Sequence, residues 1–549
     1  MLVALIDVLG TLLDYTLLAL QNWWPVLLIL VASWYAPPLP GLFDRIAAAF
    51  DRLAERRLLA TALVVLLAMS WAASSWLLRS GIPQPAMHDD HAVLLGGKMF
   101  ANGRAAYPTH PLWPHFEQFH VLQVPKYASK YPLGNELLLA LGIRLTGIPL
   151  MGAMVAAGLA CAAVFWALLA ALPPRWALAG AMATAIHPLL LNWSQSYRGG
   201  GLAAAGGALL IGATLRMATA PSPRLGAIAG AGLAMLATSR PYEGVVLAAG
   251  CALGLLCHRR RGLLVPAAVA VLVVAVLALL PIALHNRAVT GSYTTLPWQA
   301  YARQYDPAPQ FVWEKAGPVP RYRNEEFRYI YEIDYRKKFD RVTAPGGLWQ
   351  EIDRKIYFMQ WMLTADPETR RPALQWPIFL FPLALLPVAL WRDRYARMAA
   401  VMIVVFAFAP LSQFVNILTH YLAPVTAAVA LMMMLLLRRM SVHHRGRWLA
   451  VAIFLTFLVH AGSLLGWTQR NSAERRAKAV AAAGEGKHLF LVAPDVFDVV
   501  YNGPDIDQQR VLWARDLGDN RALLAYYSDR KVWRVEKTGG RDLRLVRLR

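Results

Sequence analysis

LLATALVVLLAMSWAASSWLLRSGIPQPAMHDDHAVLL, residues 58–95, is the stretch on which the fold depends. Its first part, Leu58 to Leu78, is an apolar run of the length that crosses a bilayer, for which ~20 residues are needed. A short polar loop then reaches the tetrapeptide His88-Asp89-Asp90-His91. Two adjacent carboxylates between two imidazoles are costly at a membrane surface unless they form ion pairs, bind a metal or do chemistry.

The acidic pair also has a purely structural interpretation. A helix that begins at Asp89 would carry the apolar residues 92–95 into apolar surroundings and place both carboxylates at its positively polarised N-terminus. Asp is a favoured N-cap residue, so capping alone accounts for Asp89. The residues by themselves leave capping and catalysis both open.

The composition indicates a membrane protein. Of the 549 residues, 57% are hydrophobic and 16% are charged, and the mean hydropathy is +0.40. A soluble domain carries about a quarter charged residues. The net charge of +22 is attributed to membrane topology and contact with anionic lipid phosphates, because no nucleic-acid-binding module accompanies it. The cysteines, Cys161, Cys251 and Cys257, lie in or beside apolar runs and indicate neither a disulfide framework nor a zinc site.

Eleven segments from Leu58 onward have the length and hydropathy of membrane spans. They are residues 58–78, 148–172, 176–193, 199–218, 224–240, 242–257, 263–284, 374–391, 396–415, 419–437 and 447–467. Alternate connections are rich in Arg, as at Arg175, Arg216 and Arg438. Because Lys and Arg mark the cytoplasmic side, this alternation places residues 79–147, 285–373 and 470–549 on the external face.

We therefore predict an all-α polytopic membrane protein of about 11–12 transmembrane helices with a small α/β C-terminal external domain. Residues 1–57 form an N-terminal membrane or interfacial segment, with either one span from Leu17 to Tyr35 or a re-entrant or interfacial helix. Residues 58–469 form the transmembrane domain, with external loops 79–147 and 285–373. Residues 470–549 contain strand-like runs at 489–492, 511–516 and 531–535 and are expected to pack on the membrane domain, because so short a segment makes a marginal core.

The loop that follows the acids is rich in His, Lys, Trp and Tyr and has no apolar period, and it ends in Tyr131-Pro-Leu-Gly134. A first span, an acidic pair and this last segment resemble the GT-C glycosyltransferases. These are polytopic enzymes that use polyprenyl-phosphate sugars and include the protein O-mannosyltransferases and aminoarabinose transferases. The resemblance implies that Asp89 or Asp90 is the catalytic base. We take Asp89, at the position of the family's first acid, with Asp90 replacing the family's usual Glu and orienting the acceptor or a neighbouring His.

Short external connections offer groups that suit a phosphate. Residues 194–201 combine Arg198 with three glycines, which either turn backbone amides toward an anion or allow close helix packing. Residues 238–244 contain an Arg and a Glu that either bind substrate or pair with each other. The residues expected to bind the donor phosphate or the substrate are Lys130, Tyr131, Arg198, Arg240, Glu243 and Arg287.

The resemblance implies inverting transfer of a sugar from a polyprenyl-phosphate donor to an external glycan, lipid or protein acceptor. The expected location is a bacterial inner (plasma) membrane, with the active site on the external face and membrane lipids as further partners. The alternative is a polytopic transporter or lipid-linked glycan flippase; such proteins place charges near the midplane and contain repeated halves, whereas these spans are nearly uncharged. No metal site is assigned: a divalent ion at residues 88–91 would need further ligands, from His110, His115 or His120.

Overall fold

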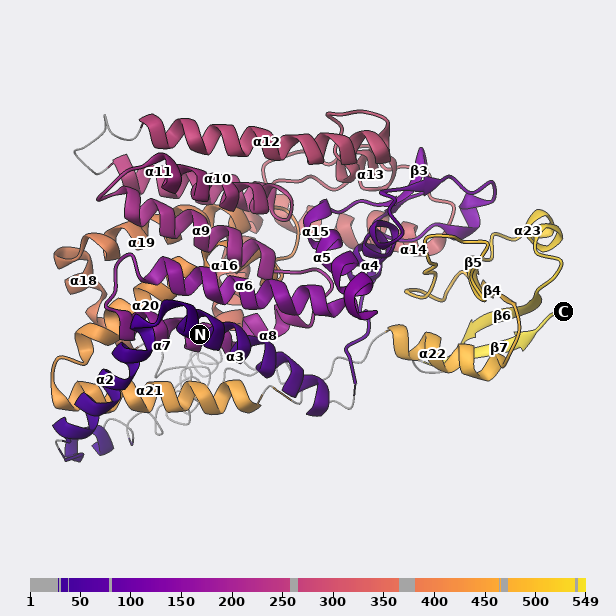
Figure 1. Ribbon diagram of the computed structural model, residues 1–549. Coiled ribbons are helices and arrows are strands. Elements are labelled where there is room, and N and C mark those ends of the chain that lie inside the picture. The colour runs from indigo at the N-terminus through magenta and orange to yellow at the C-terminus, as the bar shows by residue number, and fades with distance from the viewer. Residues whose placement is uncertain are drawn as a thin grey trace, which may run out of the picture.

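The computed structural model describes residues 28, 31–37, 39–78, 81–256, 265–364, 381–463, 465, 472–538 and 542–549. It shows a bundle of helices, with polar loops and the C-terminal region gathered at one end of the bundle (Figure 1). Most of the span expected from Leu17 to Tyr35 lies outside the described residues, as do residues 374–380 of the span expected at 374–391.

Five helical segments are long and apolar enough to cross a membrane. They are α3 (Arg57–Leu78), α6 (Leu150–Leu168), α12 (Val265–Thr290), α19 (Arg394–Ser412) and the continuous segment formed by η5 (Thr419–Val425) and α20 (Thr426–Met440). The shorter apolar helices are α9 (Gly201–Met217), α10 (Pro223–Ala237), α11 (Pro241–Leu256) and the η4–α18 pair (Phe381–Leu385 and Leu386–Arg392). The prediction of a multi-pass helical membrane protein is confirmed, whereas the expected number of spans is not fully confirmed, since five segments of membrane-crossing length are found within the described residues.

The span predicted at 176–193 is wrong, because the structure divides it into α7 (Pro174–Ala185) and α8 (Pro188–Ser194). His187 precedes a proline, which keeps its backbone extended, with ψ 136°. Its side chain accepts a hydrogen bond from the Leu189 N–H and so caps the second helix. The helix α12, by contrast, is longer than predicted. It continues to Thr290 beyond its predicted end at 284, so the second external loop begins later than expected.

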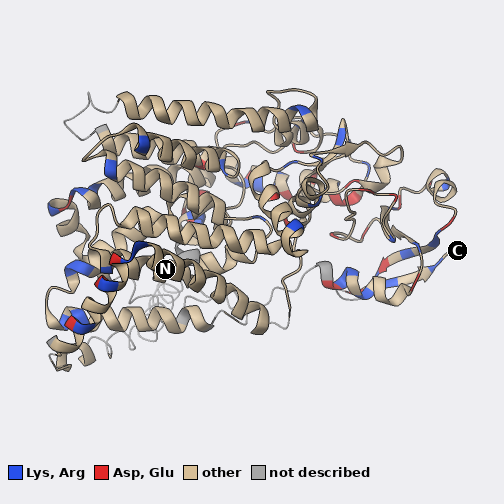
Figure 2. Ribbon diagram, in the orientation of Figure 1, with Lys and Arg blue, Asp and Glu red and all other residues tan. Residues whose placement is uncertain are grey.

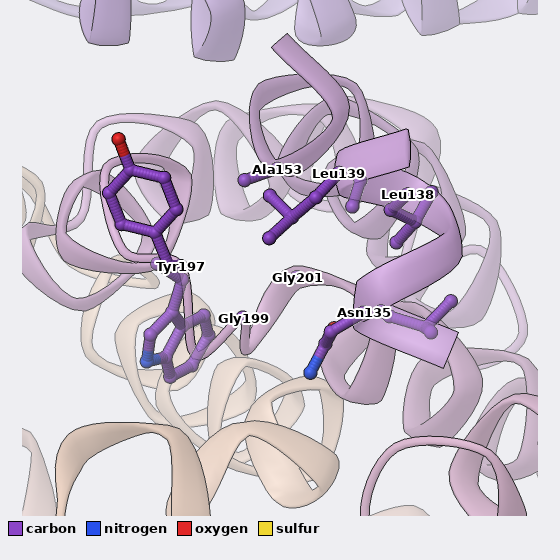
Figure 3. Close-up of a pocket in the computed structure, with 10 residues that line it drawn as sticks. Asn135, Leu138, Leu139, Ala153, Tyr197, Gly199 and Gly201 are labelled. Carbon is purple, nitrogen blue, oxygen red and sulfur yellow. The ribbon is translucent and has the colours of Figure 1, made fainter. Parts of the chain in front are cut away.

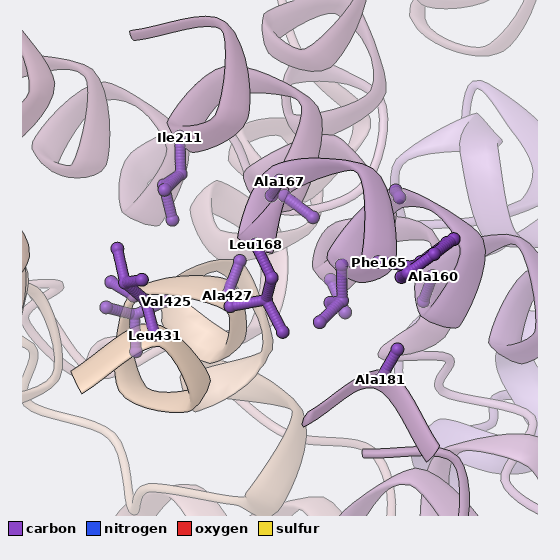
Figure 4. Packing of buried hydrophobic residues seen from close by; sticks show 14 of the residues in the cluster. Ala160, Phe165, Ala167, Leu168, Ala181, Ile211, Val425, Ala427 and Leu431 are labelled. Atoms are coloured by element: carbon purple, nitrogen blue, oxygen red, sulfur yellow. The ribbon is translucent and has the colours of Figure 1, made fainter. Parts of the chain in front are cut away.

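Small residues let the central helices approach closely. The buried core around α6, α9 and α20 contains many alanines, among them Ala160, Ala167 and Ala427 (Figure 4). Gly207 of α9 lies so close to η5 that an added Cβ would overlap with the carbonyl group of Pro424. This packing is typical of membrane helices. Because the hydrophobic effect does not drive association within lipid, the helices are held together by van der Waals contacts, which small residues make possible at close range.

The charged residues distinguish the two ends of the bundle (Figure 2). At the end away from the polar loops, ion pairs join the helix turns: Arg175 to Asp51 of the amphipathic helix α2 (Pro40–Glu55) at 3.0 Å, and Arg439 to Asp393 at 3.3 Å. The helix α21 (His444–Ser463) starts at this same end, where Arg447 lies 3.7 Å from Asp44. The Arg-rich turns thus meet on one side, as the alternation in the sequence predicts.

The first polar loop contains more regular structure than its sequence indicates. It begins with α4 (His88–Ala101) and continues with η1 (Trp113–Phe116) and a small antiparallel sheet of β1 (Tyr107–Pro108), β3 (Lys126–Ser129) and β2 (Val121–Leu122) in that order. It ends in α5 (Leu133–Thr146), which packs against α4. The second polar loop contributes α13 (Pro297–Tyr305), α14 (Glu325–Phe327), the π-helical turn η3 (Arg328–Asp334), α15 (Tyr335–Thr343) and α16 (Gly347–Thr364).

The C-terminal region forms an α/β layer, and the strands expected in it are present. After α22 (Ser472–Ala483), four strands form a sheet in the order β5-β4-β6-β7, with bounds Val511–Arg515, His488–Val492, Lys531–Lys537 and Leu543–Arg547. β4 pairs in parallel with β5 and β6, whereas β7 is antiparallel at the edge; α23 (Arg521–Tyr526) precedes β6. The region packs on the polar loops through the buried ion pair between Arg515 and Glu326, 2.8 Å long.

Candidate active site

The residue at which α4 begins determines the positions of Asp89 and Asp90 in the helix. The helix begins at His88, with Met87 as an N-cap that makes no side-chain bond, so the prediction of Asp89 as the N-cap is wrong. Both acids lie in the first turn, where the helix dipole favours negative charge. Asp90 instead ties the helix to the loop before it, because its Oδ2 accepts from the backbone N–H of Ala86 at 3.0 Å.

Asp90 is the more deeply placed acid. Its side chain is 5% exposed, and its Oδ1 accepts from Nε of Arg198 at 3.1 Å. Burial raises the pKa of Asp90, against the opposing effect of Arg198 and of the Ala86 N–H, and the neighbouring charge of Asp89 raises it further. Both oxygens of this carboxylate are therefore engaged in holding the loop together.

Asp89 has different surroundings and keeps 27% of its side chain exposed. Its Oδ1 accepts a short hydrogen bond from the Tyr131 hydroxyl, and Nε2 of His120 lies 3.7 Å from the same oxygen. Burial alone would raise the pKa of this carboxyl, but His120, Arg198, the Tyr131 hydroxyl and Lys130 together hold the pKa well below its usual range. Asp89 is thus an ionised carboxylate with an accessible oxygen, which a general base requires.

Connections far apart in the sequence meet around the start of α5. The backbone N–H of Gly134 donates to the Thr238 carbonyl at 2.8 Å, and Asn135 donates to the Arg198 carbonyl at 3.0 Å. The turns that carry Arg198 and Arg240 therefore both pack on the segment that carries Tyr131. The structure brings together the first loop and both short connections, residues 194–201 and 238–244, that the sequence indicated.

Arg240 and Glu243 are close neighbours, as the pairing alternative predicted. The guanidinium of Arg240 lies 4.0 Å from Oε1 of Glu243 and stacks over the ring of Tyr421, 4.3 Å from its centroid. Glu243 is buried and accepts from Gln413 at 3.1 Å. The distance of 4.0 Å leaves the guanidinium donors of Arg240 only weakly engaged by the carboxylate.

Lys130 and two residues of the second loop complete the wall beside Asp89. The ammonium of Lys130 lies over the Tyr301 ring, 4.8 Å from its centroid, and 5.6 Å from that of Tyr131. Burial lowers the pKa of Lys130, opposed by Asp306 and Asp89. The Tyr301 hydroxyl accepts from the His120 backbone N–H at 3.1 Å and so holds the loop that presents His120.

Several of these residues were not expected at the site from the sequence. His120 was expected only as a possible metal ligand, and Tyr301, Tyr421 and Asp306 were not among the expected site residues. The one signal for His120 is its place in a loop dense in polar aromatic residues. The contacts of Tyr301 and Asp306 join segments more than 170 residues apart, so no local pattern could have indicated them.

Arg287 lies elsewhere in the structure. It is exposed in the last turn of α12, and its guanidinium lies 4.8 Å from the centroid of the Tyr293 ring. Among the described residues, no hydrogen bond or ion pair connects it to Asp89 or Arg240. We therefore place it outside the site.

The glycine run before α9 serves packing. Gly199 and Gly200 have φ values of 79° and 130°, and a Cβ at Gly200 would overlap with the ring of Trp193. Figure 3 shows Gly199 and Gly201 at a small pocket, opposite Asn135, Leu138 and Leu139 of α5. Because its lining is mostly apolar and carries no charged side chain, this pocket does not suit a phosphate.

The histidines of the first loop are engaged with other partners. Within the described ranges, no group of three or more His, Cys, Asp or Glu side chains is arranged to hold a metal ion. His110 bonds to Asp507 at 3.2 Å, and His115 bonds to the Arg515 carbonyl at 2.9 Å, so both fasten the C-terminal region to the loop.

The structure thus combines a bundle of apolar helices, an acid-bearing helix that follows the first long span, and a small α/β region at the same end as the polar loops. ArnT from Cupriavidus metallidurans in its apo state is similar over 87% of this chain and 93% of its own, with a TM-score of 0.51 and 14% identity. At that identity the likeness establishes the fold alone.

Two further structures match with scores too low to establish a shared fold. ArnT from Cupriavidus metallidurans bound to undecaprenyl phosphate covers 86% of this chain and 92% of its own, at 14% identity and a TM-score of 0.49. An oligosaccharyltransferase from Archaeoglobus fulgidus in the apo form covers 77% and 54%, at 15% identity and 0.41. No family model matches the chain, and a search of curated proteins gives no match either.

Proposed function

We propose that this chain is a membrane glycosyltransferase that moves a sugar from a polyprenyl-phosphate donor to a hydroxyl group of an external acceptor, with inversion. The observation that carries the proposal is the placement of Asp89. It is an ionised, partly accessible carboxylate in the first loop of a GT-C-like fold, with Lys130, Arg198 and Arg240 around it.

In the proposed reaction, the Asp89 carboxylate takes the proton of the acceptor hydroxyl. The acceptor oxygen then attacks the anomeric carbon of the donor, and the bond between that carbon and the phosphate oxygen breaks. The electron pair leaves with the lipid phosphate. A positioned base of this kind contributes about 10²–10⁴ in rate.

The cations are suited to the leaving phosphate, on which negative charge develops. Arg198 is fixed by Asp90, and Arg240 is fixed by stacking on Tyr421, so neither needs to be ordered when the donor binds. Lys130 helps to lower the pKa of Asp89, and Arg240 acts in the same direction on the pKa of the neighbouring Tyr131, so both cations lie close to the Tyr131–Asp89 pair. We propose Lys130, Tyr131, Arg198, Arg240 and Glu243 as the donor-binding set.

The location follows from the same reasoning. A polyprenyl tail is best held against apolar helix surface, and the outer face of the bundle offers such surface on α12 and α19, as at Leu277 and Val404. Because Arg-rich turns gather at the end opposite the site, we propose that the site faces the external side of a bacterial inner membrane.

The test is incubation of the purified protein with labelled polyprenyl-phosphate sugars and a panel of glycan, lipid and protein acceptors. We expect acceptor-dependent release of lipid phosphate. Movement of the lipid across a vesicle membrane without any release would identify a flippase instead and refute the proposal.

A matched pair of variants tests the donor site. Arg240→Ala should weaken donor binding at least tenfold, since a charge-assisted hydrogen bond contributes ~1.5–3 kcal/mol. Arg287→Ala removes an exposed Arg that also stacks on a tyrosine, and it should leave the donor affinity unchanged. Equal donor affinity in both variants would assign Arg240 to packing.

A further inference from the structure

A second polar cluster adjoins Asp89 and is supplied largely by the C-terminal region. His88, the first residue of α4, has its Nδ1 at 2.6 Å from the Tyr501 hydroxyl and 3.2 Å from Oδ1 of Asp498. Asp498 and Tyr501 belong to the segment between β4 and β5. The ring of Tyr501 also stacks on His91, with centroids 3.7 Å apart and planes 8° apart.

The hydrogen bonds within the cluster assign the tautomer of His88. The Tyr501 hydroxyl donates its proton to Asp498 in a short bond, so its oxygen is available as an acceptor toward His88. The Nδ1 of His88 therefore carries a proton and donates it, and in the neutral imidazole Nε2 is the acceptor nitrogen. In the part of the chain that the structure describes, no hydrogen bond is made by Nε2, and 23% of the side chain is exposed.

The C-terminal segment is held in this position by several contacts. Asp498 has a φ of 62°, a backbone conformation that is uncommon for residues other than glycine. Its N–H donates to Oε1 of Glu326 at 2.7 Å, and Glu326 in turn pairs with Arg515. The guanidinium of Arg476 lies 5.4 Å from the Tyr501 ring centroid. A strained residue that neighbouring groups hold in place is typical of functional sites.

The position of His88 relative to Asp89 suits the acceptor side of the site. The His88 ring lies beside that of His120, with the two ring centroids 6.4 Å apart, and His120 in turn packs on the Tyr131 ring at 5.8 Å. Nε2 of His120 lies 3.7 Å from Oδ1 of Asp89. His88 and Asp89 therefore both border His120, so one molecule bound beside His120 can contact both.

We propose that Nε2 of His88 accepts a hydrogen bond from a second hydroxyl of the acceptor while Asp89 deprotonates the first, and that Asp498 and Tyr501 are positioning residues that fix the His88 ring. The acceptor class is then a molecule with neighbouring hydroxyl groups, that is, a sugar. This inference rests on the proposed function, since it names the acceptor of that same site. It assigns to the C-terminal region a direct part in building the acceptor side.

The test compares Tyr501→Phe, which keeps the stack on His91 but removes the hydroxyl, with Asp498→Asn and with His88→Phe. Asp519→Asn is the control, because Asp519 lies in the same region and pairs with the exposed Arg521. Kinetics with a sugar acceptor and equilibrium binding of the labelled donor are measured for each purified full-length variant.

We expect the acceptor KM to rise about three- to tenfold in the first three variants, the effect of one lost hydrogen bond, with an unchanged donor Kd. The control should match the wild type in both. An unchanged acceptor KM in Tyr501→Phe and Asp498→Asn, or a parallel loss of donor binding, would overturn the positioning role. If the wild-type protein releases no lipid phosphate with any acceptor, the proposed function itself fails, and this inference fails with it.

Discussion

Asp89→Asn and Asp90→Asn each replace one carboxylate oxygen with an NH2 group, at adjacent positions. The structure nevertheless predicts opposite outcomes for the two variants. Only one oxygen of Asp89 is engaged, and the amide oxygen of Asn can still accept from Tyr131. Helix capping is not at risk, because Met87 is the N-cap. The variant loses the attraction of the Asp89 charge to the nearby cations and to the helix dipole, the latter about 0.3–1 kcal/mol, and it no longer carries the cost of burying that charge. It should fold normally.

Its activity should fall by about 10²–10⁴, because an amide cannot accept the proton of the acceptor hydroxyl. That factor corresponds to about 2.7–5.4 kcal/mol of transition-state stabilisation, at 1.36 kcal/mol for each tenfold change. Asp90→Asn should instead act on stability. Both of its oxygens accept, from Arg198 and from Ala86, and the amide group of Asn turns a donor toward one of them. An unsatisfied buried donor costs about 1–3 kcal/mol.

The assay is release of lipid phosphate at saturating donor, with thermal unfolding measured on the same samples. We expect Asp89→Asn to keep the wild-type unfolding temperature and lose transfer, and Asp90→Asn to unfold at a lower temperature with part of its transfer left. Transfer by Asp89→Asn within threefold of the wild type would refute the assignment of the base. Full loss in a stable Asp90→Asn protein would move the role to Asp90.

Three further outcomes follow from particular contacts. Tyr131→Phe removes a bond that lowers the pKa of Asp89, so that pKa should rise and the acid limb of the pH–rate profile should move to higher pH; an unmoved limb would show that another group sets it. Gly207→Ala should lower the unfolding temperature by overpacking against Pro424, a cost of about 1–3 kcal/mol, whereas Gly81→Ala, in open space, should not. An impermeant thiol reagent on intact cells should label cysteines on the external side and leave the opposite side protected, and the reverse pattern would invert the topology. The positions are Gln84, Thr343 and Asp529 for the external side and Arg224 for the other.

The sequence predicted those features that depend on local composition. Apolar runs of membrane length became α3, α6, α12, α19 and η5–α20, and the alternating strand signals of the C-terminal region became β4, β5 and β6. Hydropathy could not detect the break at His187-Pro188, because the residues on both sides of it are equally apolar. The restriction that proline places on the preceding residue was the available signal.

The candidate site could be predicted only in part, because its contacts are not local. Asp89, Tyr131 and Arg198 were identified from loop residues of the right chemistry, and the structure brings them together. Arg198 pairs with Asp90 and thereby leaves Asp89 the more accessible of the two acids. The position of Arg198 depends in turn on the packing of residues 194–201 on Asn135. The approach of Tyr501 to His88 joins positions 413 residues apart, so only the folded chain reveals it.

The divergence between fold and sequence has a physical basis in this architecture. The bundle is built from Ala, Gly, Leu and Val, and lipid-facing positions such as Leu277 and Val404 accept any apolar residue. Such positions carry little identity between proteins of the same fold, which is consistent with 14% identity to ArnT over 87% of this chain. The constraint falls on the few polar residues at one end, where Asp90 is buried and pairs with Arg198 while the side chain of Asp89 stays partly exposed. A substitution that loosens this pair should therefore harm the site more than many exchanges among the apolar residues of the spans.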